Sequence, residues 1–154
     1  MTPNLKIVSV GSGKGGVGKS LLCTNMAIAM ALSGLKVVLI DTDYGASNLH
    51  AMLGIGNPKL GLKDIFKQSD LDPEALLLNT GIDNLKFLSG AGDFPGSANM
   101  NSEQIGRISN LIRGLEADMA FIDLPPGNGA INMHLFDLAD HQVVVCTPEM
   151  TSAM

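Results

Sequence analysis

Aromatic residues and cysteines are scarce in this chain of 154 residues, which has no tryptophan, one tyrosine and two cysteines. Cys23 and Cys146 are 123 positions apart, so they form no C-x-x-C pair. Iron–sulfur and zinc sites typically need such closely spaced thiolates, and within these residues the two cysteines cannot supply them. We therefore expect both cysteines to be reduced core residues of a cytosolic protein.

Long apolar runs and strong basic charge are also lacking. No apolar run approaches the length that spans a bilayer, and the N-terminus carries no charged-plus-apolar targeting pattern, so the expected compartment is the cytoplasm. The formal net charge is −5. A domain of this charge is no general polyanion binder, and we expect no strong nucleic-acid binding beyond a local contact.

Aliphatic residues are abundant, and apolar runs of strand length alternate with helical patterns along the chain. This alternation predicts an α/β fold with three layers and a doubly wound, mostly parallel sheet. The predicted strands are residues 5–10, 36–40, 85–89, 119–122 and 142–147. The predicted helices are residues 20–33, which read as buried almost all round, then 48–53, 62–68 and 73–78, and a last helix from 101 or 102 to 115.

The most specific motif lies between the first predicted strand and the first predicted helix. Its residues are Gly13, Lys14, Gly15, Gly16, Val17, Gly18, Lys19 and Ser20. They satisfy G-x-x-x-x-G-K-[ST], the phosphate-binding loop, whose glycines let backbone N–H groups point at phosphate oxygens. Lys19 would reach the β- and γ-phosphates, and the Ser20 hydroxyl would help to hold Mg²⁺. The alternative is a glycine-rich turn that binds nothing.

Aspartates stand at the ends of two other predicted strands. Asp41 and Asp43 follow strand 36–40, and Asp123 follows strand 119–122. Carboxylates at such strand ends can bind Mg²⁺ and orient an attacking water. Each motif taken alone is equally well explained by aspartates that cap backbone N–H groups in a turn. Gly127, behind two prolines, can present its N–H to a γ-phosphate. Together the three motifs favour a nucleotide site.

These motifs resemble those of the MinD/ParA family of deviant-Walker ATPases. The resemblance rests on the segment 14–20, on residues 41–43 with Asn48, and on the segment 123–127. Segment 45–54 is most similar to the flagellar-number regulators of the family, the FlhG/FleN branch. The resemblance implies that Asn48 belongs to the first switch and Gly127 to the second.

The resemblance also assigns roles to charged residues. Lys14 would cross a dimer interface to the partner's nucleotide, and Asp43 would orient the attacking water. Asp41 and Asp123 would hold the water shell of Mg²⁺, together with Ser20. Lys14, Lys19 and Asp43 are thus the predicted catalytic residues.

For the whole protein the resemblance implies the cofactors ATP and Mg²⁺ and slow hydrolysis in an ATP-dependent homodimer. A protein activator or a positioned partner would stimulate this cycle. The output would be spatial or numerical regulation: flagellar placement or number, the division site, or plasmid and chromosome positioning. Some branches of the family also associate peripherally with the inner membrane.

Two features depart from the family pattern. Leu21 stands where the family has a hydroxyl residue, which removes one contact to the α-phosphate. Relatives also continue beyond the position of Met154, with a portion that supplies the adenine pocket and, in some branches, an amphipathic membrane-binding helix. We therefore expect residues 1–154 to form a single P-loop ATPase domain that is truncated at its C-terminal end.

Two other functions stay open. Mrp-type iron–sulfur cluster carriers have a Pro-Pro-Gly second switch that resembles residues 125–127, although the two cysteines argue against a cluster here. A nucleotide-binding module without hydrolysis would carry the same phosphate loop. Iron content tests the first alternative, and phosphate release tests the second.

Overall fold

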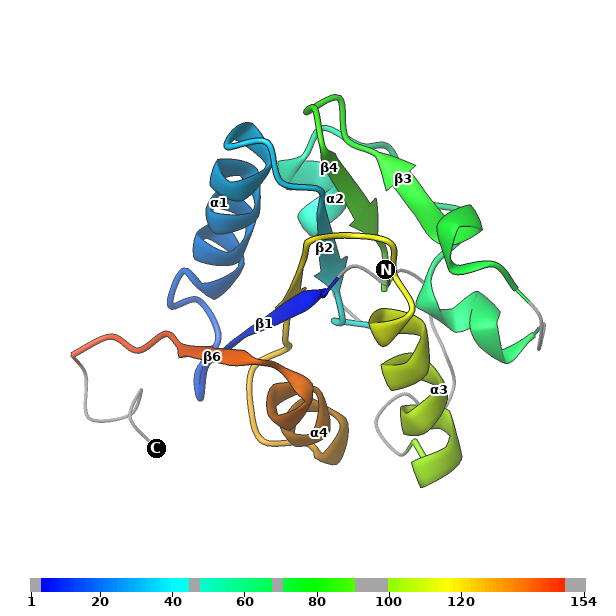
Figure 1. Ribbon diagram of the computed structural model, residues 1–154. Coiled ribbons are helices and arrows are strands. Elements are labelled where there is room, and N and C mark those ends of the chain that lie inside the picture. The colour runs from blue at the N-terminus through cyan, green and yellow to red at the C-terminus, as the bar shows by residue number, and fades with distance from the viewer. Residues whose placement is uncertain (1–3, 45–47, 68–70, 91–99, 149–154) are drawn as a thin grey trace.

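The computed structural model describes residues 4–44, 48–67, 71–90 and 100–148 (Figure 1). Its strands are β1 (Lys6–Gly11), β2 (Val37–Asp41), β3 (Leu77–Asn79), β4 (Leu85–Leu88), β5 (Met119–Asp123) and β6 (His141–Val144). They form one sheet in the order β3-β4-β2-β5-β1-β6. The described pairs are parallel except β3 with β4, which is antiparallel. The predicted mostly parallel α/β sheet is confirmed.

Helices cover both faces of this sheet. They are α1 (Lys19–Leu32), α2 (Leu49–Met52), α3 (Ser102–Arg113) and α4 (Ala130–Leu138), with two 3₁₀ turns, η1 (Leu62–Phe66) and η2 (Pro73–Leu76). Figure 1 shows α1 on one side of the sheet and α3 and α4 on the other. Alternate strand residues enter two cores, so that Leu39 packs with α1 while Val38 and Ile40 pack with α3 and α4. This is the three-layer arrangement that buried parallel strands require.

Helix α1 is not buried all round, and that prediction is wrong. Its inner face consists of Cys23, Ala27 and Ala31, each at most 1% exposed. The larger Leu21 and Leu32 are 58% and 72% exposed. Small residues at spacings of four let the helix lie close to the sheet, whereas overall apolarity does not tell which face of a helix is inside.

The predicted helix over residues 73–78 is also wrong. Its start is confirmed, because Asp72 accepts a hydrogen bond from the Glu74 N–H at 3.0 Å, but the 3₁₀ turn ends at Leu76. Leu77 and Leu78 then pair with β4 and point into opposite cores. Pairing with an existing sheet thus overrides a short helical pattern. Likewise, the predicted helix over 62–68 is a 3₁₀ turn over Leu62–Phe66.

The region after β5 differs most from the prediction. Helix α4 was not predicted, although Leu135 on its inner face is fully buried. The last strand ends at Val144 rather than at residue 147, and Cys146 beyond it is exposed. The expected burial of Cys146 is therefore wrong, while that of Cys23 is confirmed. Strand β6 forms one edge of the sheet and has a single neighbour there, which explains its exposure.

None of the helices in the described ranges has the length and apolar character needed to cross a bilayer.

Candidate functional site

The phosphate-loop motif connects β1 to α1 at the carboxyl edge of the sheet. Gly16 and Gly18 have φ angles of 78° and 91°. Residues with a Cβ rarely adopt this left-handed backbone conformation. Gly18 is the N-cap of α1, and among the described residues no side chain caps it. The first N–H groups of α1 are therefore available to an anion, and the helix dipole favours one there.

One cavity of about 430 Å³ brings residues of all three motifs together. Its lining residues are Ser12, Gly15, Gly16, Gly18, Lys19, Ser20, Leu21, Asp41, Asp43, Asn48, Leu49, Asp123 and Pro126. The motifs meet because β5 lies between β1 and β2 in the sheet, so the loops that follow these three parallel strands are neighbours at its carboxyl edge. A cavity of this size is typical of small-molecule sites.

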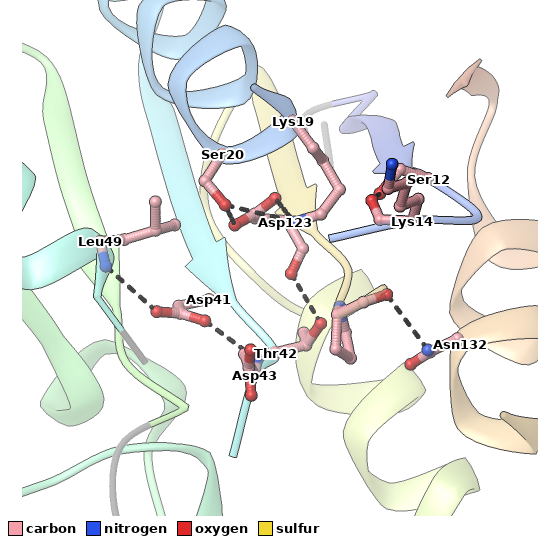
Figure 2. A network of polar contacts seen from close by, with 11 residues as sticks. Ser12, Lys14, Lys19, Ser20, Asp41, Thr42, Asp43, Leu49, Asp123 and Asn132 are labelled. Atoms are coloured by element: carbon pink, nitrogen blue, oxygen red, sulfur yellow. Dashed lines mark hydrogen bonds and ion pairs between the residues drawn. The ribbon is translucent and has the colours of Figure 1, made fainter. Parts of the chain in front are cut away.

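Three side chains that line this cavity form a tight polar cluster (Figure 2). The Lys19 Nζ lies 2.5 Å from the Asp123 Oδ1, and the Ser20 Oγ donates to the Asp123 Oδ2 at 2.6 Å. The side chains of Lys19 and Asp123 are only 10% and 4% exposed. Asp123 therefore neutralises the lysine that is predicted to meet a phosphate.

Asp41 lies beside Asp123, because the two residues are paired in register across β2 and β5. Asp41 Oδ1 accepts the Asp43 N–H at 2.9 Å, and Oδ2 accepts the Leu49 N–H at 3.4 Å. The capping role that the sequence left open for Asp41 is thus present. Because each carboxylate oxygen has further acceptor capacity, capping leaves room for a metal-bound water.

The neighbouring Thr42 joins the two strand ends. It is 1% exposed, and its hydroxyl donates to the Asp123 carbonyl oxygen at 2.8 Å (Figure 2). Its backbone N–H donates to the same oxygen at 3.1 Å. The segment that carries Asp43 is therefore fixed to the strand that carries Asp123.

The predicted Mg²⁺ ligands Ser20, Asp41 and Asp123 all line the cavity. Within the described ranges there is no group of three or more His, Cys, Asp or Glu side chains that would bind a metal alone. Mg²⁺ keeps several waters and takes one or two carboxylates with substrate phosphates. A hydroxyl and two carboxylates beside a phosphate loop therefore fit this ion.

Other predicted site residues lie outside the cavity. Gly13 and Gly127 line an adjacent cavity of about 300 Å³, with apolar walls that include Leu124 and Phe136. The Gly127 N–H donates to the Ser12 carbonyl oxygen at 3.1 Å. Residues that do not line the main cavity also include Lys14, which is exposed, and Val17, which is half-buried. Segment 45–47, part of the resemblance to the flagellar regulators, lies outside the described residues.

Sequence reasoning missed Asn132 and assigned no role to Thr42. Asn132, in α4, is 7% exposed and its amide contacts the loop before Gly129. The available signal was a polar residue three positions before the buried Leu135, on the inner face of an apolar helix. Because that helix was not predicted, the position of Asn132 on its inner face could not be recognised.

Tyr44, the only tyrosine, yields a first prediction. It is 7% exposed, its hydroxyl has no hydrogen-bond partner in the described part of the chain, and burial, followed by the Asp41 charge, raises the pKa of its phenol. An unsatisfied buried hydroxyl is costly, so Tyr44→Phe should raise the free energy of unfolding by about 1 kcal/mol. Urea unfolding followed by circular dichroism measures this change.

Thr42→Val is the matched control, because it removes a buried hydroxyl that does have a partner. It should lower stability by about 1 kcal/mol. If Tyr44→Phe lowers stability as much as Thr42→Val does, the Tyr44 hydroxyl has a partner in solution and the prediction is wrong.

Comparisons with known proteins identify related P-loop NTPases. The family model described as "ParA: NUBPL iron-transfer P-loop NTPase" matches residues 4–154. Septum site-determining protein MinD of Helicobacter pylori is 36% identical over 149 residues, which cover 95% of this chain and 54% of that protein. Flagellum site-determining protein YlxH of the same organism is 29% identical over 155 residues, covering 95% of this chain and 49% of that protein.

A solved structure has the same fold. It is MinD from Pyrococcus horikoshii complexed with Mg-ADP, with a TM-score of 0.80 and 26% identity, covering 96% of this chain and 60% of that chain. The chain spans about half the length of the two curated relatives. Because the family model matches almost all of the chain and the MinD fold is shared, this chain belongs to the MinD/ParA family of P-loop NTPases.

Proposed function

We propose that this chain is a single P-loop ATPase domain that binds ATP with Mg²⁺, hydrolyses it slowly and acts as a dimerisation switch. The observation that carries the proposal is the polar cluster in which Lys19 and Ser20 of the phosphate-loop motif contact Asp123 at the end of β5. It supplies a cation, a hydroxyl and a carboxylate where phosphate and Mg²⁺ would meet.

The chemistry follows from the positions of these groups. Lys19 exchanges the Asp123 carboxylate for phosphate oxygens and neutralises their charge. Ser20, Asp41 and Asp123 would hold Mg²⁺, which when bound would add positive charge near the same oxygens. Asp43, at the cavity wall, aligns a water with the bond that breaks. Phosphoryl transfer needs positioning and charge neutralisation more than covalent catalysis, so these groups suffice for slow turnover.

The dimerisation switch rests on Lys14. Its place on the exposed side of the phosphate loop, outside the main cavity, suits a cation that acts on the nucleotide of a second copy. Such a cation adds transition-state stabilisation that an isolated protomer lacks. ATP would then control dimerisation, and a protein activator could control hydrolysis.

The proposed output is spatial or numerical regulation of a cellular structure. It is supported by the names of two relatives, a septum site-determining and a flagellum site-determining protein. We propose that the protein acts in the cytoplasm, with peripheral association at the inner membrane in the full-length form, as the family resemblance implies.

Lys14→Ala tests the switch. The wild-type chain should shift from monomer to dimer in ATP, and the variant should stay monomeric with turnover at least about tenfold lower, because the charge supplied by the partner is lost. Light scattering in ATP and phosphate release measure the two effects. Lys59→Ala, which removes an exposed lysine outside both cavities, is the control and should behave as wild type. Normal dimerisation and hydrolysis by Lys14→Ala would refute the role of this lysine.

Iron–sulfur transfer is a second candidate, favoured by the description of the matching family model and by the Pro-Pro-Gly segment. The cysteines oppose it. Cys23 is fully buried, and this burial, followed by the Asp123 charge, raises the pKa of its thiol and disfavours the thiolate that a cluster needs. Iron bound to the purified protein would reverse this ranking. Nucleotide binding without phosphate release would instead identify a binding module.

A further inference from the structure

The side chain of Asn132 bridges helix α4 and the loop that follows Asp123. Its Nδ2 donates to the Pro125 carbonyl oxygen at 3.2 Å and to the Gly127 carbonyl oxygen at 3.4 Å. Figure 2 shows Asn132 pointing from α4 toward this loop. Asn132 is 7% exposed, so these contacts are formed largely away from water, where an unpaired amide would be costly.

The two accepting carbonyls lie on either side of one peptide bond. The Pro125 carbonyl belongs to the peptide before Pro126, and the Gly127 carbonyl belongs to the peptide after Gly127. Between them is the peptide that joins Pro126 to Gly127 and carries the Gly127 N–H. That N–H donates to the Ser12 carbonyl oxygen at 3.1 Å and so faces the phosphate loop.

The neighbouring residues restrict this peptide to one low-energy motion, a rotation about its own axis. Proline fixes φ at both Pro125 and Pro126, and a residue before proline is confined to extended conformations. Asn132 holds the peptide on the far side. The remaining freedom is ψ of Pro126 and φ of Gly127, and Gly127, at φ 99°, can take either sign of φ. Opposite changes in these two angles rotate the central peptide and leave its neighbours in place.

We propose that Asn132 is a positioning residue for the γ-phosphate. Asn132 fixes the peptides on both sides. The motion that remains for the loop is rotation of the peptide between Pro126 and Gly127. This rotation moves the Gly127 N–H from the Ser12 oxygen toward the γ-phosphate. The inference rests on the proposed ATPase function and adds to it the residue that lets the site distinguish ATP from ADP.

The test compares affinities for a non-hydrolysable ATP analogue and for ADP, both with Mg²⁺, by isothermal titration calorimetry. Asn132→Ala removes the amide, and Asn132→Asp keeps its shape but replaces the donor with an acceptor. Each should lower the preference for the ATP analogue over ADP about tenfold, roughly the value of the bridging hydrogen bonds. Asn128→Asp, an exposed position in the same loop, adds the same charge and should leave the preference unchanged.

A double-variant cycle tests whether Asn132 acts through Gly127. Gly127→Ala destabilises the resting orientation of this peptide, because alanine is strained at φ 99°, while the added Cβ meets nothing within 4 Å. The orientation of the peptide then no longer depends on Asn132. If the mechanism is right, Asn132→Ala should change the preference little further in the Gly127→Ala background.

The outcomes separate the two proposals. A wild-type chain that binds neither nucleotide overturns the proposed function and this inference with it. If the wild type binds both but the Asn132 variants weaken both equally, or change only the melting temperature, Asn132 is merely structural and the inference alone is wrong. Additive effects in the double variant also overturn it.

Discussion

Replacing Lys19 with alanine is expected to abolish nucleotide binding. Lys19 is a largely buried cation that lines the main cavity, and its ammonium would make charge-assisted contacts to two phosphates. Hydrogen bonds to charged groups are worth about 1.5–3 kcal/mol each, so affinity for ATP should fall roughly 100-fold or more. Titration calorimetry or displacement of a fluorescent ATP analogue measures the loss.

The same substitution should also destabilise the fold, and this effect must be separated from binding. Removing Lys19 leaves the buried Asp123 carboxylate without its cation, which costs about 3–5 kcal/mol in such pairs. The double variant Lys19→Met with Asp123→Asn removes both charges and should recover most of that stability. It should still not bind ATP. Binding by this folded double variant would contradict the role given to Lys19.

Asp43→Ala should have the second largest effect, by stopping turnover while leaving nucleotide binding intact. A positioned carboxylate that aligns or deprotonates water contributes about 10²–10⁴-fold to rate, so phosphate release should fall at least about 100-fold. The local fold should survive, because the bond from residue 43 to Asp41 is made by the backbone N–H, which alanine retains.

Asp83→Ala is the matched control for Asp43→Ala. It removes an exposed aspartate from the loop that precedes β4, at the opposite edge of the sheet, and should leave phosphate release unchanged. Full hydrolysis by Asp43→Ala would rule out the water-aligning role. Loss of ATP affinity together with turnover would instead make Asp43 a binding residue.

The parts of the fold that follow from short sequence patterns were predictable. The glycine and lysine motif identifies the phosphate loop in the sequence alone. The positions of Asp41 and Asp123 are predictable because residues that follow parallel strands lie together at the carboxyl edge of the sheet. The register that places those two aspartates side by side confirms this geometry.

The parts that depend on tertiary packing were not predictable. The sequence around Leu77 and Leu78 does not alternate as a strand does. These residues form a strand because they pair with the edge of β4. Leu21 and Leu32 are apolar yet lie outside, because the small inner residues of α1 set how closely the helix approaches the sheet. The contact between Asn132 and the loop depends on the position of α4, which the sequence analysis did not identify.

The two cysteines, described above as buried and exposed, give the chain a chemical asymmetry that is useful for measurement. Cys23 is shielded by the sheet and its thiol resists ionisation, so alkylating reagents should react at Cys146 first. One equivalent of a maleimide dye would therefore label the native sequence at a single site next to β6, with no engineered cysteine. Together with the absence of tryptophan, this makes the protein a low-background substrate for energy-transfer studies of its assembly.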